Sequence, residues 1–302
     1  MRCRRRGEVT GSVGRQGGPE YRGEISMGEL LDRYEVILLD SYGVLIHQHG
    51  PLQGALALVG TMNAIDKQYF ILTNDASRSP DAASRRYHSL GLAIPPGRII
   101  TSGSLIASYF AAKNLRGARC IVLGPDDSVR YVAEAGGEVI PAADDADPEV
   151  VAVCDESGFP FLDTVDGVLT SVFRRLDAGK PLHLLLPNPD LIFPRGERSY
   201  GLTAGSIAMV LEAALALRYP SGDYPRFVPL GKPHPPIFEE ALRRGGSHNM
   251  VMIGDQLDTD IRGARAFGID SALVPTGLTH IGGGGLGDIY PTFVLPTLVR
   301  GR

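Results

Sequence analysis

Cysteine is scarce in this chain, which has three in 302 residues. Cys3, Cys120 and Cys154 are odd in number, far apart and without a CxxC pattern. Disulfide-rich domains pair their cysteines and structural zinc sites space them closely, so the sequence argues against both. The pattern suits a reducing compartment, and we expect a cytoplasmic protein.

Long apolar runs and a strong net charge are lacking as well. No run of apolar residues approaches the roughly 20 that span a bilayer. The formal net charge is −4, which gives no general attraction to nucleic acid or to an anionic membrane. We therefore expect neither nucleic acid nor a membrane as a partner. A content of 43% hydrophobic and 21% charged residues is that of a soluble globular protein.

The first 26 residues differ in composition from the rest of the chain. They are rich in Arg and Gly and contain almost no large aliphatic residue. Such a segment cannot bury enough apolar surface to fold, so residues 1–26 are predicted to be a disordered N-terminal extension. A basic tail for an acidic partner is the alternative. Met27 opens the first patterned segment, where we expect the folded protein to begin.

Short aliphatic runs alternate with helical patterns in the remainder of the chain. Runs that are apolar on successive residues are typical of parallel strands buried on both faces. Strands are expected at residues 34–40, 68–74, 249–255, 271–277 and 293–296, and helices at residues 52–67 and 79–91. This alternation predicts an α/β fold with a doubly wound, mostly parallel, Rossmann-like sheet.

A middle section interrupts this alternation with elements of its own. We expect strands in it at residues 120–124, 167–172 and 183–187. Loops at the ends of sheet strands tolerate insertions, and a lid over a site is a common purpose of one. The sequence thus predicts three parts: the extension 1–26, a core domain of residues 27–114 and 227–302, and an inserted α/β cap domain of residues 115–226.

Polar side chains stand where the expected core strands end. The carboxyl ends of parallel strands share one crevice, so residues distant in sequence converge there. Phosphoryl transfer needs a nucleophile, Mg2+ to gather oxygens, and donors for the phosphoryl group. Carboxylates can supply the first two, and hydroxyl, amide and ammonium groups the third. The candidates are Asp40, Thr73, Asn74, Lys232, Asp255 and Asp260.

Each of these residues alone has an ordinary structural explanation. An Asp after a strand is most often a turn residue or a helix cap, and Thr73-Asn74 is common turn chemistry. Lys232 before a proline is normally a solvated loop lysine, and Asp260 suits the first turn of a helix. The indication of a site therefore comes from the order of the four segments and from their common place at strand ends.

Four segments, DSYGVL, LTNDAS, GKPHPPIFEEAL and GDQLDTDI, occur in this order between residues 40 and 261. Together they resemble the motifs of the haloacid dehalogenase superfamily, and the nearest branch is that of the NagD-type sugar phosphatases and 4-nitrophenylphosphatases. The resemblance covers residues 34 to 302 and implies a HAD core with a cap between the second and third motifs. It also implies a Mg2+-dependent hydrolase of small phosphorylated metabolites.

The resemblance also assigns roles to single residues. It implies that Asp40 is the nucleophile of a phospho-aspartyl intermediate and a metal ligand, that Asp255 binds the metal and that Asp260 steadies the metal shell. Thr73 and Lys232 would hold the phosphoryl group, with Asn74 beside them.

Tyr42 departs from the family pattern. The first motif of the family reads Asp-x-Asp, and the second Asp serves as general acid and base while its main-chain carbonyl binds Mg2+. Tyr42 keeps the carbonyl and loses the acid, which is worth typically 10^2–10^4-fold in rate. A slow phosphatase, an enzyme for good leaving groups, and a non-catalytic phosphate-binding or metabolite-binding protein are the three outcomes that remain open.

Further candidates have weaker support from the sequence. Asn188 and Asp190, in the segment NPDLIFPRG, resemble the substrate-facing part of the cap, although Asn-Pro-Asp is also good turn chemistry. His47 and His49 could replace the lost acid or lie on the surface. The expected partner is a small phosphorylated metabolite. A homodimer through the cap is compatible with the sequence, which shows no self-complementary stripe.

Overall fold

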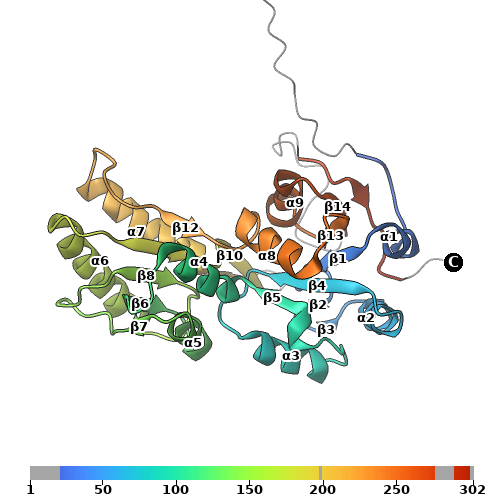
Figure 1. The fold of residues 1–302 in the computed structure, drawn as a ribbon, viewed down its shortest axis with the longest axis horizontal. Coiled ribbons are helices and arrows are strands. Elements are labelled where there is room, and N and C mark those ends of the chain that lie inside the picture. Colours follow the sequence, from blue (N-terminus) through green and yellow to red (C-terminus); the bar gives the residue numbers. More distant parts are fainter. Residues whose placement is uncertain (1–20, 197–198, 276–288, 300–302) are drawn as a thin grey trace, which may run out of the picture.

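The computed structural model describes residues 21–196, 199–275 and 289–299 (Figure 1). The predicted disordered extension falls mainly on residues 1–20, which lie outside this part. Residues 22–25 pack against the C-terminal segment, where Ile25 N donates to Val294 O at 3.0 Å and the Ile25 side chain is buried. The folded chain therefore begins before Met27.

Six parallel strands form the first sheet, in the order β15-β14-β13-β1-β4-β5. These strands are β1 (Val36–Leu39), β4 (Gln68–Thr73), β5 (Ile99–Thr101), β13 (Met250–Gly254), β14 (Asp270–Leu273) and β15 (Phe293–Val294). Every residue of β1 and β13 is buried, because these central strands are covered on both faces. This covering explains why their sequences are continuous aliphatic runs.

Helices cover the two faces of this sheet. The helices are α1 (Met27–Arg33), α2 (Ala55–Ala64), α3 (Pro80–Ser89), α4 (Ile106–Lys113), α8 (Pro235–Gly245) and α9 (Arg262–Phe267). In β1, Ile37 and Leu39 pack with α1, α2 and α3, whereas Val36 and Leu38 pack with α4, α8 and α9. This alternation follows from side chains that point to opposite faces of a strand. The predicted doubly wound α/β class is confirmed.

A second parallel sheet lies within the middle of the chain, in the order β12-β9-β8-β6-β7. Its strands are β6 (Arg119–Leu123), β7 (Glu138–Val139), β8 (Val150–Val153), β9 (His183–Leu186) and β12 (Phe227–Pro229), and its helices are α5 (Asp126–Glu134), α6 (Phe161–Asp177) and α7 (Ala204–Arg218). Because β12 pairs with β9, the chain returns to the first sheet after residue 229.

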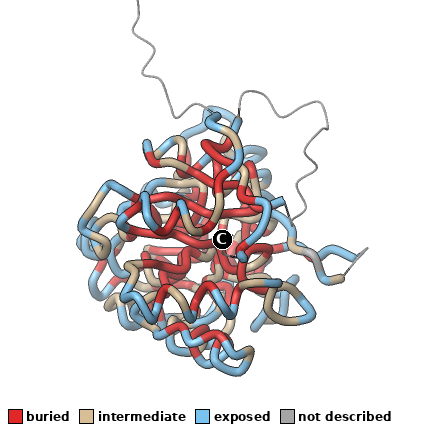
Figure 2. Tube along the Cα trace, turned by 90° about the vertical axis from the view of Figure 1, so that its right-hand side faces the viewer, coloured by how far each residue is buried: buried red, intermediate tan, exposed pale blue. Residues whose placement is uncertain are grey.

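The two sheets share one of the hydrophobic clusters. Helix α4 carries Ile106 and Phe110 into the same cluster as Cys120 and Val150 of the second sheet. Figure 1 shows α4 beside the second sheet, near the junction with the first. In Figure 2 the buried chain runs through the centre of the molecule, and the exposed chain lies at the rim.

One expected strand of the middle section is wrong. Residues 167–172 lie inside helix α6, because Val165, Val168 and Val172 recur at helical spacing and bury one face of that helix. The neighbouring strand is β8 instead, whose four residues are all buried.

Two short hairpins face each other where the halves of the molecule meet. They are β2 (Ile46–His47) with β3 (Gly50–Pro51), and β10 (Ile192–Gly196) with β11 (Ser199–Leu202). A Cβ at Gly196 would lie 3.9 Å from Gln48 Oε1, so the hairpins approach closely. Among the helices that the structure describes, none combines the length and apolarity needed to cross a membrane.

Candidate active site

Strand ends of the first sheet and the segment after β12 of the second sheet bring a lysine and three aspartates together. Asp40 follows β1, Asp255 follows β13, and Lys232 follows β12. The Lys232 ammonium donates to Asp40 Oδ1 at 2.6 Å and to Asp260 Oδ1 at 2.7 Å. Lys232 is 3% exposed and Asp260 is fully buried, so this ammonium is held by the two carboxylates away from water.

The same three carboxylates form a candidate metal centre. Asp40, Asp255 and Asp260 each offer an oxygen, and these oxygens lie within 4.8 Å of one another. Burial, together with repulsion from neighbouring carboxylates, raises the pKa of Asp255 to about 8 and that of Asp260 to about 7. Burial alone would lower the pKa of Lys232. The negative charges of Asp260 and Asp40 outweigh this effect, so the pKa of Lys232 is raised. When ionised, the three buried carboxylates outnumber the one ammonium, and this excess of negative charge suits a divalent cation with hard-oxygen ligands.

Close backbone approaches allow the cluster to form. Gly43 has φ +89°, and a Cβ placed there would lie 2.1 Å from Asp255 Oδ2. The loop after Asp40 can therefore reach Asp255 only with glycine at position 43. On the other side, a Cβ at Gly254 would lie 2.2 Å from the Asp260 side chain. Asp260 sits in a π-helical turn, η3 (Leu257–Ile261), and its Oδ2 accepts from Gln256 N at 3.2 Å.

Thr73 and Asn74, at the end of β4, differ in what their side chains contact. Thr73 Oγ1 accepts from Asp75 N at 3.2 Å, which leaves its O–H able to donate. Asn74 Nδ2 donates to Asp190 Oδ1 and to Lys232 O, both at 2.9 Å, and Asn74 Oδ1 accepts from Lys232 N at 2.7 Å. The Asn74 amide, expected to contact phosphate, instead braces the Lys232 backbone and links it to the middle section.

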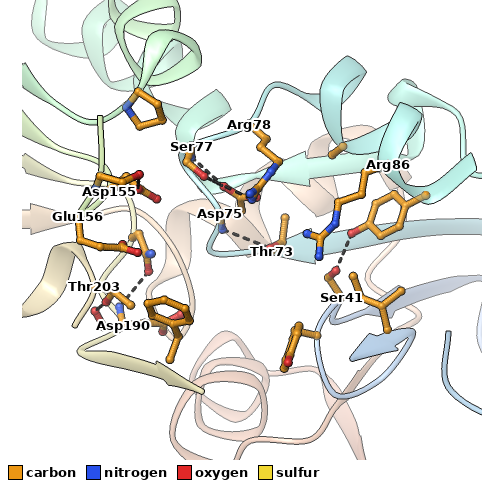
Figure 3. A pocket seen from close by; sticks show the side chains of 18 residues that line it. Ser41, Thr73, Asp75, Ser77, Arg78, Arg86, Asp155, Glu156, Asp190 and Thr203 are labelled. Atoms are coloured by element: carbon orange, nitrogen blue, oxygen red, sulfur yellow. Dashed lines mark hydrogen bonds and ion pairs between the residues drawn. The ribbon is translucent and has the colours of Figure 1, made fainter. Parts of the chain in front are cut away.

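A cavity of ≈ 590 Å³ opens beside the cluster. Both halves of the molecule line it, and Figure 3 shows their side chains facing each other across it. Tyr42 is half-buried and lines this cavity together with Asn188 and Asp190. Asn188 Oδ1 accepts from Asp190 N at 3.1 Å, and burial raises the pKa of Asp190. The structure thus brings Tyr42, Thr73, Asn188 and Asp190 to the cavity. The remaining candidates lie in the buried cluster or, in the case of Asn74, brace Lys232.

Sequence reasoning missed several residues that line the cavity. Arg78 precedes the N-cap of α3, Arg86 lies in the last turn of α3, and Asp155 and Glu156 follow β8. No motif marked them, although acids directly after the strand β8 follow the same strand-end rule that identified Asp40. His47 and His49 lie at the tip of the β2–β3 hairpin, outside the described residues that line the cavity.

Comparison with known proteins gives the family. A model described as haloacid dehalogenase-like hydrolase matches residues 37–138, and a second, HAD-hydrolase-like model matches residues 229–300. Together they cover more than half of the chain and hold the candidate residues Asp40, Thr73, Lys232 and Asp255.

Curated proteins similar to this chain include phosphatases. The chain is 28% identical to a dihydroxyacetone phosphatase of Corynebacterium glutamicum, over 80% of this chain and 81% of that protein. It is 29% identical to a D-glycerol 3-phosphate phosphatase of Mycobacterium tuberculosis, over 83% of this chain and 66% of that protein.

Solved structures show the same architecture. A possible sugar phosphatase of the HAD superfamily from Cytophaga hutchinsonii matches with a TM-score of 0.76 and 28% identity, over 93% of this chain and 99% of that one. A 4-nitrophenylphosphatase from Thermotoga maritima matches in fold with a TM-score of 0.75 and 24% identity, over 90% of this chain and 97% of that one. The protein belongs to the haloacid dehalogenase-like hydrolases, with the fold of their NagD and 4-nitrophenylphosphatase branch.

Proposed function

We propose that the protein is a Mg2+-dependent phosphatase of small phosphorylated metabolites that works through a phospho-aspartyl intermediate on Asp40. The class, a hydrolase of phosphoric monoesters, follows from the family and from the curated relatives. The observation that carries the rest is the buried cluster of Asp40, Lys232, Asp255 and Asp260, next in sequence to Ser41 and Tyr42, which line the cavity.

The proposed reaction has two displacements at phosphorus. In the first, a carboxylate oxygen of Asp40 forms a bond to phosphorus, the bond to the leaving oxygen breaks, and that oxygen takes up a proton. In the second, a water oxygen bonds to the same phosphorus, the water loses a proton, and the Asp40 carboxylate is released with inorganic phosphate. The Thr73 hydroxyl and the Lys232 ammonium donate to the phosphoryl oxygens as charge shifts onto them.

Asp40, Asp255 and the Tyr42 main-chain carbonyl would hold Mg2+, with Asp260 steadying this shell. When bound, the ion would supply positive charge to phosphoryl oxygens and offset the crowded carboxylates. Asp260 is suited to its supporting role because its two oxygens already accept from Lys232 Nζ and Gln256 N.

Tyr42 sets the expected speed of turnover. The Tyr42 hydroxyl can donate a hydrogen bond to the leaving oxygen, but position 42 holds no carboxylate to accept the proton of the attacking water. The second displacement then becomes the slow one. Since general acid–base help contributes typically 10^2–10^4-fold, we propose a slow phosphatase.

The second sheet would act as a cap that selects the leaving group. It presents Asp155, Glu156 and Thr203 to the cavity, and these carboxylate and hydroxyl groups suit a neutral, hydroxylated leaving group. We propose residues 115–226 as this cap and residues 27–114 and 227–302 as the core, with β12 (Phe227–Pro229) pairing with the sheet of the cap where the chain crosses back.

The experiment is a hydrolysis assay of the full chain with Mg2+, using 4-nitrophenyl phosphate, dihydroxyacetone phosphate and glycerol 3-phosphate. Wild-type protein should release phosphate, and Asp40→Asn should lower the rate by at least about 10^3-fold because the nucleophile is lost. Equal rates for the two proteins would contradict the assignment of Asp40. Tyr42 also favours a second candidate function, a phosphate-binding or metabolite-binding protein without turnover, which steady release of phosphate would exclude.

A further inference from the structure

Charged side chains are distributed unevenly around the cavity. Among the residues that the structure describes, two arginines line it, Arg78 and Arg86. The Arg78 guanidinium donates to Asp75 Oδ2 at 2.8 Å, and the negative charge of Asp75 raises the pKa of Arg78. Arg86 forms no ion pair or side-chain hydrogen bond with any described residue. Its guanidinium is therefore the cation at this cavity whose charge is not already matched by a protein carboxylate.

Arg86 is placed to meet an anion at the reacting end of the cavity. Figure 3 shows its guanidinium extending from α3 into the cavity, toward the side where Ser41 and Thr73 lie. Ala83, one turn earlier on α3, also lines the cavity, and its small side chain leaves room beside the guanidinium.

The helix that carries Arg86 is fixed to the loop of the nucleophile. Tyr87, the next residue, is buried, and its hydroxyl donates to Ser41 Oγ at 2.6 Å. Ser41 directly follows Asp40. The distance between the Arg86 backbone and the Asp40 loop is thus held by a buried contact, which lets a long and exposed side chain act at a defined place.

The charges nearby show why a further cation is needed. The Lys232 ammonium is already shared between Asp40 and Asp260. A phosphate monoester that enters the cavity also meets Asp155, Glu156 and Asp190 on the wall opposite α3. A planar guanidinium matches two phosphate oxygens with two N–H donors, which a lysine cannot do.

We propose that Arg86 binds the phosphate group of the substrate and is a phosphate-binding residue of this site in addition to Thr73 and Lys232. The inference rests on the proposed function for the identity of the ligand, a phosphate monoester. Arg86 contacts inorganic phosphate, the product, in the same way, and this contact can be tested separately.

The test compares Arg86→Gln with wild type in the full chain with Mg2+, using calorimetric titration with inorganic phosphate. The Kd for phosphate should rise roughly 10- to 100-fold, since charge-assisted hydrogen bonds are lost. Arg86→Lys should restore part of the affinity through its charge. Arg85→Gln is the matched control: Arg85 is exposed on the same helix, does not line the cavity, and should leave Kd unchanged within about twofold.

Kinetics with 4-nitrophenyl phosphate give a second readout. KM should rise more than kcat falls, and the unfolding temperature should stay that of wild type, because Arg86 is exposed. Phosphate affinity of Arg86→Gln equal to wild type would overturn the inference, as would a wild-type protein that binds no phosphate at millimolar concentration. If wild type binds phosphate without hydrolysing any ester while Arg86→Gln loses binding, the inference stands and the proposed phosphatase activity fails.

Discussion

Two clusters of charged side chains differ in their charge and in the strand ends at which they lie. At the carboxyl ends of the first sheet, three carboxylates cluster and two of them, Asp40 and Asp260, accept from Lys232. At the amino ends of the second sheet, three cations surround one carboxylate, where Asp147 accepts from Arg119 at 2.6 Å, Arg175 at 2.7 Å and Lys180 at 2.9 Å. The first has surplus negative charge and the second surplus positive charge.

Exposure to water separates the two clusters. The side chains of Arg119 and Lys180 are 41% and 51% exposed, so water can solvate the surplus charge around Asp147. Lys232 and Asp260 are buried, and water cannot do the same there. The pKa values follow: the ligand set holds the pKa of Asp147 well below its usual range, whereas those of Asp255 and Asp260 are raised. A surplus of one charge indicates a binding site only when the charged groups are also buried.

The largest expected effect comes from adding a carboxylate to the first cluster. Tyr42→Asp should raise kcat for phosphate monoesters by about 10^2–10^4-fold in the presence of Mg2+, because it supplies a general acid and base. Steady-state assays with 4-nitrophenyl phosphate measure this gain. Tyr42→Asn, of similar size but without an ionisable group, should give none. Equal rates for Tyr42→Asp and an active wild type would mean that another group handles the proton.

The second prediction removes a carboxylate from the same cluster. Asp255→Asn should stabilise the metal-free protein by about 1–3 kcal/mol, because it removes a carboxyl group whose ionised form is disfavoured by burial and by repulsion from Asp40 and Asp260. Mg2+ at 100 times its Kd should stabilise wild type by about 2.7 kcal/mol and the variant far less. Denaturant unfolding with and without Mg2+ measures both effects. A variant that Mg2+ stabilises as much as wild type would contradict the role of Asp255 as a ligand.

The core of this site could be predicted from sequence because its signals are local. A buried strand that ends in Asp40 or Asp255 is visible as an aliphatic run, and the sheet topology then brings the ends together. The helix expected at residues 79–91 is also local, and in the structure Ala82 N donates to Ser79 Oγ at 3.3 Å at its start. These features depend on neighbours along the chain.

The features of the site and fold that could not be predicted depend on contacts between segments far apart in sequence. Asn74 was expected at the phosphate, and only the packing of residues 74, 190 and 232 shows that its amide is used to brace Lys232. Arg86 looks like any solvated arginine on a helix until Tyr87 is seen to fix that helix against Ser41. Helix α6 was mistaken in part for a strand, because a short apolar run does not by itself distinguish the two periods.

The smallest expected effect on activity comes from removing the carboxylate at the centre of the second cluster. Asp147→Asn should destabilise the fold by about 1–3 kcal/mol, because Arg175 is nearly buried and loses its carboxylate partner. The exposed neighbour Asp145 forms no ion pair with a described residue, so Asp145→Asn is the matched control and should change stability little. Phosphatase activity at saturating substrate should be that of wild type in both variants.

The pH dependence of this last effect gives a further check. The folded state lowers the pKa of Asp147, so its contribution is fully present above the unfolded pKa of about 3.9 and is lost as pH falls toward the lower folded value. The difference in unfolding free energy between wild type and Asp147→Asn should thus be constant at neutral pH and shrink below about pH 4. A difference that instead grew on acidification would place the stabilising charge on another group. Asp255→Asn should raise the unfolding free energy of the metal-free protein and Asp147→Asn should lower it. These opposite signs would show that the first cluster binds a cation and the second holds the second sheet together.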